Sequence, residues 1–235
     1  MDIAQLVIDY HTQERPSTSG KLYPSSLGGC IRQEMMRWHN EHARGEIPYI
    51  KTHPMDAATL WKLKRYGWYE QAFACVGGVE QVNVESEWWH GKIDRLVDGT
   101  ILEVKSLSPY APYESLPYQA HKYQVWAYWL LADAEHYNPP IHTAVIAYIT
   151  RWYEGKEPEI YTFDVTPTAE ELEETRCLME IYEDAAQQDE LPGRPFSDAE
   201  EHPYLCMRRD KKSGKVISRC EYYGHCWEDA VYLPF

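Results

Sequence analysis

Three short segments between residues 79 and 106 alternate apolar and polar side chains: VEQVNVES, HGKIDRLV and TILEVKS. Alternation with a period of two is typical of β-strands that bury one face. The dipeptide Asp98–Gly99 separates the last two segments. Because Asp-Gly between alternating residues favours a two-residue turn, we expect these two strands to form an antiparallel hairpin.

The expected turn also fixes which residues face each other across the hairpin. Counting outward from Asp98 and Gly99 pairs Val97 with Thr100, Leu96 with Ile101, Arg95 with Leu102, and Asp94 with Glu103. Lys105 lies two positions beyond Glu103 and therefore shares its face. The side chains expected on the opposite face, where they can be buried, are Ile93, Val97, Leu102 and Val104.

Helical patterns lie on both sides of these strands. Before them we expect a helix from about Leu27 to His42, with Ser25 or Ser26 as its N-cap, and another over residues 56–76. After them we expect a helix over 118–137, strands over 141–150 and 159–166, and an acidic helix over 170–190. The order α-α-β-β-β-α-β-β-α predicts an α/β protein whose mixed sheet is flanked by helices.

Composition and charge narrow the classes of protein. The chain has 235 residues, 44% of them hydrophobic, and a net charge of −14, which argues against wholesale wrapping of nucleic acid. The longest apolar run has eight residues and is too short to span a bilayer, and the first residues do not resemble a secretory signal. We therefore expect an intracellular protein, in the cytoplasm of a prokaryote or of a virus-infected cell.

One basic cluster stands out from the acidic background. It contains Arg208, Arg209, Lys211, Lys212 and Lys215, within the segment RRDKKSGK. Such a cluster can follow the backbone of a single DNA strand, while exposed aromatic residues stack on its bases. The alternative is a solvated loop with no ligand, and the sequence leaves both open.

Two opposed carboxylates repel each other, so Asp94 and Glu103 need a compensating positive charge. Lys105 supplies one, and a divalent cation would supply two. Oxygen ligands favour Mg²⁺ or Mn²⁺, and a lysine beside such an ion can activate water or stabilise charge on a phosphate. The pattern indicates metal-assisted phosphodiester hydrolysis, and the alternative is a weak ionic network on an exposed face.

The helix after the hairpin carries further candidates. His121, Gln124 and Tyr128 lie on one helical face, where Gln124 and Tyr128 could bond the lysine, a water or a DNA phosphate. The alternative for Tyr128 is simple core packing beside Trp126, Trp129 and Leu130.

The combination of GKID, ILEVK and QVWAY resembles the PD-(D/E)xK nuclease superfamily, and in particular its RecB-like exonucleases. The resemblance implies a restriction-endonuclease-like fold. It further implies that Asp94, Glu103 and the Val104 carbonyl are metal ligands, that Lys105 is catalytic, and that Gln124 and Tyr128 form the helix motif. Glu70, three residues after Gly67, is the candidate for the family's acidic residue on the preceding helix.

The six cysteines refine the resemblance. Cys75 and Cys177 lie in expected helices and are predicted to be buried, while Cys30, Cys206, Cys220 and Cys226 lie toward the two ends. The segments YPSSLGGCIRQEMM and CEYYGHC are similar to those of CRISPR-associated and viral RecB-like nucleases, which implies a four-iron four-sulfur cluster on these four residues. The thirteen residues between Cys206 and Cys220 depart from the family's shorter spacing. Tetrahedral zinc is the alternative, although its usual paired Cys-x-x-Cys knuckles are absent from the sequence.

Together these features predict three regions: N-terminal helices with the first cysteine over 1–50, the nuclease core over 51–192, and a cysteine-rich segment over 193–235. The predicted function is metal-dependent hydrolysis of single-stranded DNA or DNA ends, in CRISPR adaptation, recombination or viral DNA processing. The alternatives are a non-catalytic subunit of a DNA-processing complex and a structural-zinc module that binds DNA.

Overall fold

A computed structural model of the whole chain describes residues 20–42, 73–107, 113–150, 158–188, 190–193, 207–209 and 216–219. The chain divides into two compact units. The first unit comprises Met1–Leu27 and Thr52–Met179, and the second comprises Gly28–Lys51 and Glu180–Phe235. Among the described residues, no helix combines the length and apolar character needed to cross a membrane.

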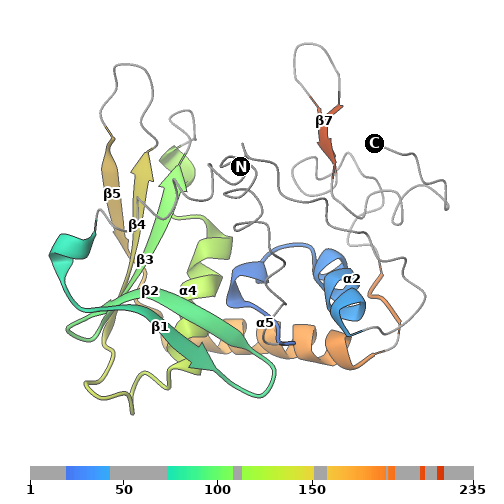
Figure 1. Cartoon of the computed structure of the whole chain (residues 1–235), viewed down its shortest axis with the longest axis horizontal. Coiled ribbons are helices and arrows are strands. Elements are labelled where there is room, and N and C mark those ends of the chain that lie inside the picture. Colours follow the sequence, from blue (N-terminus) through green and yellow to red (C-terminus); the bar gives the residue numbers. More distant parts are fainter. Residues whose placement is uncertain are drawn as a thin grey trace, which may run out of the picture. The chain divides into compact units, whose positions relative to one another are not determined.

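The first unit is built on a five-stranded mixed sheet (Figure 1). Its strands are, in spatial order, β1 (Val79–Glu85), β2 (His90–Val97), β3 (Thr100–Leu107), β4 (Thr143–Thr150) and β5 (Ile160–Asp164). β3 and β4 are parallel, whereas the other neighbours are antiparallel. The parallel pair requires a crossover connection, and helix α4 (Gln119–Leu131) provides it. The predicted mixed α/β architecture is therefore confirmed.

The β2–β3 hairpin has the predicted turn and register. Asp98 and Gly99 have φ angles of 46° and 75°, and positive φ at both central residues is the requirement of a type I′ turn. Backbone pairing joins Val97 to Thr100, Leu96 to Ile101, and Arg95 to Leu102.

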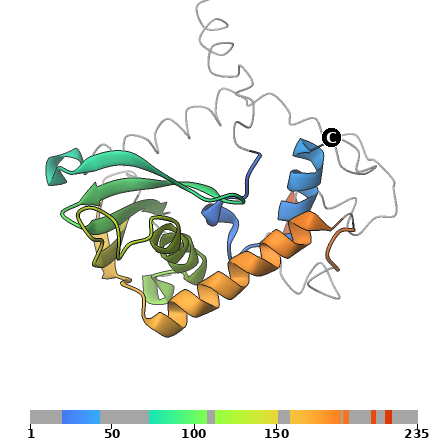
Figure 2. The same ribbon diagram turned by 90° about the horizontal axis from the view of Figure 1, so that it is seen from below.

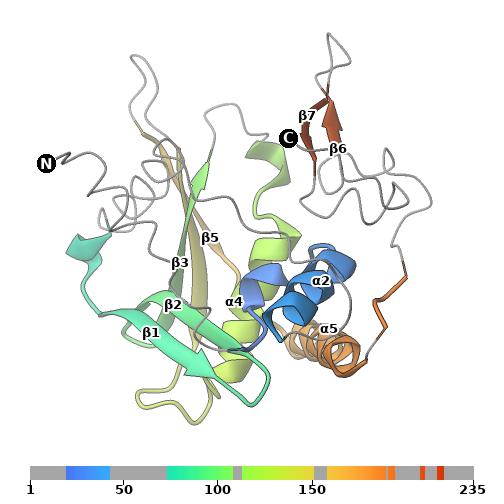
Figure 3. The same cartoon turned by 45° about the vertical axis from the view of Figure 1, so that its right-hand side comes forward.

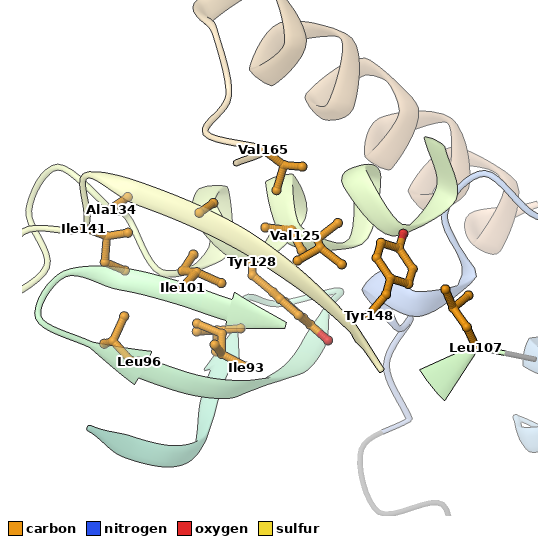
Figure 4. Packing of buried hydrophobic residues seen from close by; sticks show 13 residues of the cluster. Ile93, Leu96, Ile101, Leu107, Val125, Tyr128, Ala134, Ile141, Tyr148 and Val165 are labelled. Carbon is orange, nitrogen blue, oxygen red and sulfur yellow. The ribbon is translucent and has the colours of Figure 1, made fainter. Parts of the chain in front are cut away.

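The sheet is covered on both faces along its central strands. On one face α4 contributes Val125 and Tyr128 to a core with Ile93, Leu96 and Ile101 (Figure 4). The expectation that Ile93 shares a face with Leu102 is therefore wrong, because Leu102 packs in the cluster on the other face. The view from below in Figure 2 shows α4 against this face. On the other face a smaller cluster contains Phe73, Leu102 and Ala147. Burial of both faces explains why β4 reads as a nearly continuous apolar run.

Two helix boundaries differ from the sequence prediction. The helix expected from Leu27 begins at Ile31, as α2 (Ile31–Glu41), and is preceded by a short 3₁₀ helix, η1 (Pro24–Ser26). Gly28 separates them with a φ of 76°, which an α-helix does not allow. The helix expected to reach residue 137 ends at Leu131, and Asp133 then has a φ of 49°. The helix expected over 56–76 lies largely outside the described residues.

The prediction that Cys75 and Cys177 are buried is wrong, because both side chains are exposed. Cys75 belongs to η2 (Ala74–Val76), a single 3₁₀ turn whose three residues are all exposed, while the preceding Phe73 enters the core. Cys177 does lie in the acidic helix α5 (Ala169–Gln187), but on its solvent side.

The second unit contains α2, the end of α5 from Glu180, and a small hairpin of β6 (Met207–Arg209) and β7 (Val216–Arg219). The hairpin is visible in Figure 3. Within this unit the Tyr182 hydroxyl donates to the Gly29 carbonyl at 3.4 Å, and the Arg32 guanidinium donates to the Pro192 carbonyl. These bonds connect the segment before α2 and its first turn to the end of α5 and the residues after it.

Candidate active site

The predicted acidic residues lie where strands β2 and β3 stop pairing. Arg95–Leu102 is the last backbone pair between the two strands over their described length. Beyond it, the Val104 N–H donates to Asp94 Oδ2 at 2.8 Å, so a carboxylate takes the place of a backbone acceptor. The N–H and C=O of a strand residue point to the same side, so we expect the Val104 carbonyl to face the same gap.

Glu103 is the most deeply buried charged group of the site, with 2% of its surface exposed. Its Oε1 accepts from the Lys105 ammonium at 2.6 Å and from Gln124 Nε2 at 2.8 Å. Lys105 Nζ also donates to Gln124 Oε1 at 2.7 Å, which closes a three-membered network. Because an isolated buried carboxylate is very costly, this network is what allows Glu103 to be ionised in the interior. The predicted alternative, an ionic network on an exposed face, is therefore wrong.

Tyr128 lies one helical turn after Gln124 and contributes to both the core and the site. Gln124 Nε2 donates to the Tyr128 hydroxyl at 2.7 Å, and this hydroxyl also accepts from the Lys92 backbone N–H. Burial, with the negative charge of Glu103, raises the pKa of Tyr128 far above its usual value, so the phenol stays neutral. Figure 4 shows its ring beside Ile93. Core packing and a site hydrogen bond are thus combined in one residue.

Asp94 is half-buried beside Glu103. Burial raises the pKa of Asp94, and this rise is opposed by the Val104 N–H, the positive charge of Lys105, and side-chain hydrogen bonds to Glu103 and Gln81. The two carboxyl groups are thus within hydrogen-bonding reach of each other, as the hairpin register predicts. A hydrogen bond between the two carboxyls requires that they share one proton, and when both are ionised, they and the Lys105 ammonium leave a net negative charge that a cation would compensate.

This set of donors suits a hard divalent cation. It offers two carboxylates and a carbonyl, all oxygen, with negative charge left after Lys105 is counted. No group of three or more His, Cys, Asp or Glu side chains that could hold a metal occurs among the described residues. The predicted third acidic ligand, Glu70, lies outside them.

His121 and Tyr148 form a second layer around Lys105, and the sequence did not indicate Tyr148. His121 Nδ1 lies 2.9 Å from the Tyr148 hydroxyl, and Tyr148 is the register partner of Lys105 in the parallel β3–β4 pair. Burial, together with the charge of Lys105, lowers the pKa of His121 to about 4, so the imidazole is neutral at pH 7. Knowledge of the β3–β4 register was needed to find Tyr148.

The remaining predicted residues belong to the second unit or lie outside the described residues. Cys30 is half-buried and directly precedes α2. The other three predicted cluster cysteines, Cys206, Cys220 and Cys226, lie outside the described residues, as do Lys211 and Lys212. Arg208 and Arg209 are in β6, of which the backbone alone is described.

The fold and the site define an α/β protein whose mixed sheet holds an acidic pair and a lysine beneath a crossover helix. No protein-family model and no curated protein matches the sequence. Among solved structures, the crystal structure of SSO0001 is 16% identical, with a TM-score of 0.51, and the match covers 86% of this chain and 93% of that one. A protein from Eubacterium rectale named "Putative exonuclease" is 14% identical, with a TM-score of 0.40, over 85% of this chain and 72% of that one. At these identities the likeness to SSO0001 supports the fold alone, and the second match is too distant to add to it.

Proposed function

We propose that this protein is a metal-dependent nuclease that hydrolyses phosphodiester bonds in single-stranded DNA or at DNA ends. The observation that carries the proposal is the buried cluster of Asp94, Glu103 and Lys105 at the divergence of β2 and β3. Gln124 bonds directly to this cluster from α4, and Tyr128 bonds to Gln124 one helical turn later. The resemblance of these five residues to the PD-(D/E)xK motifs agrees with this chemistry.

In phosphodiester hydrolysis a water oxygen bonds to phosphorus, the bond to the leaving sugar oxygen breaks, and a proton passes from the water to the leaving group. A divalent cation held by Asp94, Glu103 and the Val104 carbonyl would supply Lewis-acid activation of the phosphate and of the water. Lys105 places an ammonium beside these oxygens, where it can orient the water or stabilise the developing charge. Gln124 holds Lys105 in place, because its Oε1 accepts a hydrogen bond from the Lys105 ammonium.

The proposal includes a four-iron four-sulfur cluster on Cys30, Cys206, Cys220 and Cys226, with structural zinc as the alternative metal. Cys30 supports it in two respects. Its side chain is half-buried rather than exposed like those of Cys75 and Cys177, and it belongs to the second unit, which joins residues near Cys30 to the end of α5. Bound metal would supply a covalent cross-link between distant segments of the chain.

The decisive experiment measures degradation of end-labelled single-stranded DNA with Mn²⁺ by the full chain and its Lys105→Ala variant. We expect the variant to be slower by about 100-fold or more, since a positioned acid–base or charged group contributes about that much. Lys122→Ala is the matched control, because it removes one lysine from α4, where the ammonium lies over the Trp126 ring rather than in the cluster.

Lys105→Ala leaves Glu103 buried beside Gln124 with no ammonium, so loss of activity could reflect unfolding. Asp94→Asn is therefore measured in parallel, since it keeps the shape of a half-buried side chain, and both variants are checked by thermal unfolding. Equal rates for wild type and both variants, or Mn²⁺-dependent DNA binding without cleavage, would reject the nuclease proposal. The second of these results would support a non-catalytic subunit instead.

A further inference from the structure

Strand β1 changes its backbone conformation directly opposite Asp94. The register of β1 with β2 pairs Glu80 with Arg95 and Val82 with Ile93, and it passes over the intervening residues, Gln81 and Asp94. Gln81 has a φ of 53°, in the left-handed region. Pairing of β2 with β1 thus skips Asp94. Pairing of β2 with β3, on the other side, stops at the adjacent residue, Arg95.

The left-handed conformation of Gln81 is unusual in its position. Two other described non-glycine residues have positive φ, and both lie in turns: Asp98 in the β2–β3 hairpin and Asp133 after α4. Gln81 is inside a strand, where no turn requires this conformation. Strained backbone of this kind persists only when its surroundings hold it, and it is concentrated at functional sites.

The Gln81 side chain supplies the link to the site, because its amide is hydrogen-bonded to the Asp94 carboxyl. Asp94 is therefore held from two strands, by the Val104 N–H of β3 and by the Gln81 amide of β1. Gln81 is exposed at the edge of the sheet, whereas Glu103 is buried on the inner side of the cluster. Restraint from both sides limits how far the Asp94 carboxyl can rotate.

We propose that Gln81 is a positioning residue of the nuclease site, and that its amide orients the Asp94 carboxylate for binding a divalent cation. This inference rests on the proposed function. Groups that orient a ligating carboxylate change metal affinity although they do not touch the metal, because the ligand must otherwise be ordered when the metal binds. An exposed glutamine in an alternating strand carries no recognisable pattern, so Gln81 could not be identified as a positioning residue from the sequence.

The test compares two substitutions that share only the loss of the amide. Gln81→Gly removes the side chain and relieves the left-handed strain, whereas Gln81→Met keeps a side chain of similar length and the strain. The Mn²⁺ dissociation constant of the full chain is measured by electron paramagnetic resonance of unbound Mn²⁺. We expect both variants to bind Mn²⁺ about 10-fold more weakly than wild type.

Asn83→Gly is the matched control, because it removes an amide from an exposed β1 residue that pairs with Lys92 rather than facing Asp94. Its Mn²⁺ affinity should equal that of wild type. Wild-type affinity in both Gln81 variants overturns the inference. A loss in only one of them also overturns it, since backbone strain or packing would then be the cause.

Asp94→Asn separates this inference from the function on which it rests. If Asp94→Asn loses Mn²⁺ binding while both Gln81 variants retain it, the positioning role is wrong and the nuclease site stands. If Asp94→Asn binds Mn²⁺ as wild type does, the proposed metal site itself is wrong.

Discussion

At the scale of single residues, the cluster of Asp94, Glu103 and Lys105 places a carboxylate in the interior beside groups that compensate its charge. Glu103 is nearly inaccessible, and its carboxylate relies on the ammonium of Lys105 and the amide of Gln124. Removal of one partner from such a group is costly because it leaves a charge without compensation in the interior. Gln124 serves Glu103, Lys105 and Tyr128 at once, which its two donors and one acceptor oxygen permit.

His121 gives this balance a measurable pH dependence. Its pKa is about 4 in the folded chain, below the ordinary histidine value of 6.5, so between these values the unfolded chain binds the proton first. The neutral imidazole therefore contributes fully to stability above pH 6.5, and this contribution is lost as pH falls toward 4. Because His121 is partly exposed, this contribution is discounted. We expect the free energy of unfolding to fall by about 1 kcal/mol between pH 7.5 and pH 5.

The measurement is urea unfolding of wild type and His121→Asn at these two pH values. Asparagine can replace the bond to the Tyr148 hydroxyl but does not titrate, so the variant should lose less stability on acidification. Asp94 acts in the opposite direction in both proteins, since its raised pKa makes protonation favour the folded state. Identical losses in the two proteins would contradict the neutral buried imidazole.

At the scale of elements, the site depends on how closely β2 approaches α4. Gly91 lies on β2 where a Cβ atom would stand 2.7 Å from Tyr128 Cε1 and 3.1 Å from Pro24 Cγ of η1. Glycine is thus required here by packing. The close approach lets the Tyr128 hydroxyl receive the Lys92 N–H from the same strand.

Gly91→Ala should therefore destabilise the fold by about 1–3 kcal/mol, the usual cost of overpacking. In a Tyr128→Leu background the cost should fall, because the contacting ring atom is gone, and a double-mutant cycle by chemical unfolding measures the difference. Gly77→Ala is the control, since Gly77 has a φ of 80° but no atom within 4 Å of an added Cβ. Its cost should not depend on Tyr128, and equal coupling for both glycines would contradict the packing argument.

At the scale of the whole molecule, α5 belongs to both units. The boundary falls between Met179 and Glu180, so its first turns are part of the sheet unit and its last turns part of the unit with α2. A shared helix means that the two units are not independent segments of the chain. The three regions predicted from the sequence divide the chain differently, because they follow sequence order, whereas the second unit joins residues from both sides of the first.

The proposed iron–sulfur cluster gives a prediction at this scale. Anaerobically purified full-length protein should be brown, as expected for an iron–sulfur cluster held by thiolates. Cys30→Ala should lose the colour and most of the iron, whereas Cys177→Ala should keep both, because Cys177 is exposed on α5 and is not one of the four predicted ligands. Colourless protein with stoichiometric zinc would instead favour the structural-zinc alternative, and equal iron in both variants would exclude Cys30 as a ligand.

The sequence prediction was wrong or incomplete where tertiary contacts determine which side chains are buried and which residues meet. Alternation and helical spacing located β2, β3 and the start of α4 closely, because these patterns follow from local geometry. The burial of Cys75 and Cys177 was predicted wrongly, because the period of a helix indicates a face but not what covers it. Gln81 and Tyr148 were missed, because one depends on a left-handed residue within a strand and the other on a pairing between distant segments.

The sequence by itself determined the hairpin, and with it the placement of Asp94 opposite Glu103 with Lys105 on the same face. A two-residue turn and an extended backbone leave little freedom over such short distances. Only the tertiary structure decided that Glu103 is buried, that α4 brings Gln124 to both Glu103 and Lys105, and that Gln81 restrains Asp94. These contacts join segments far apart in the chain, so they depend on which faces pack together, and local sequence patterns do not contain that information.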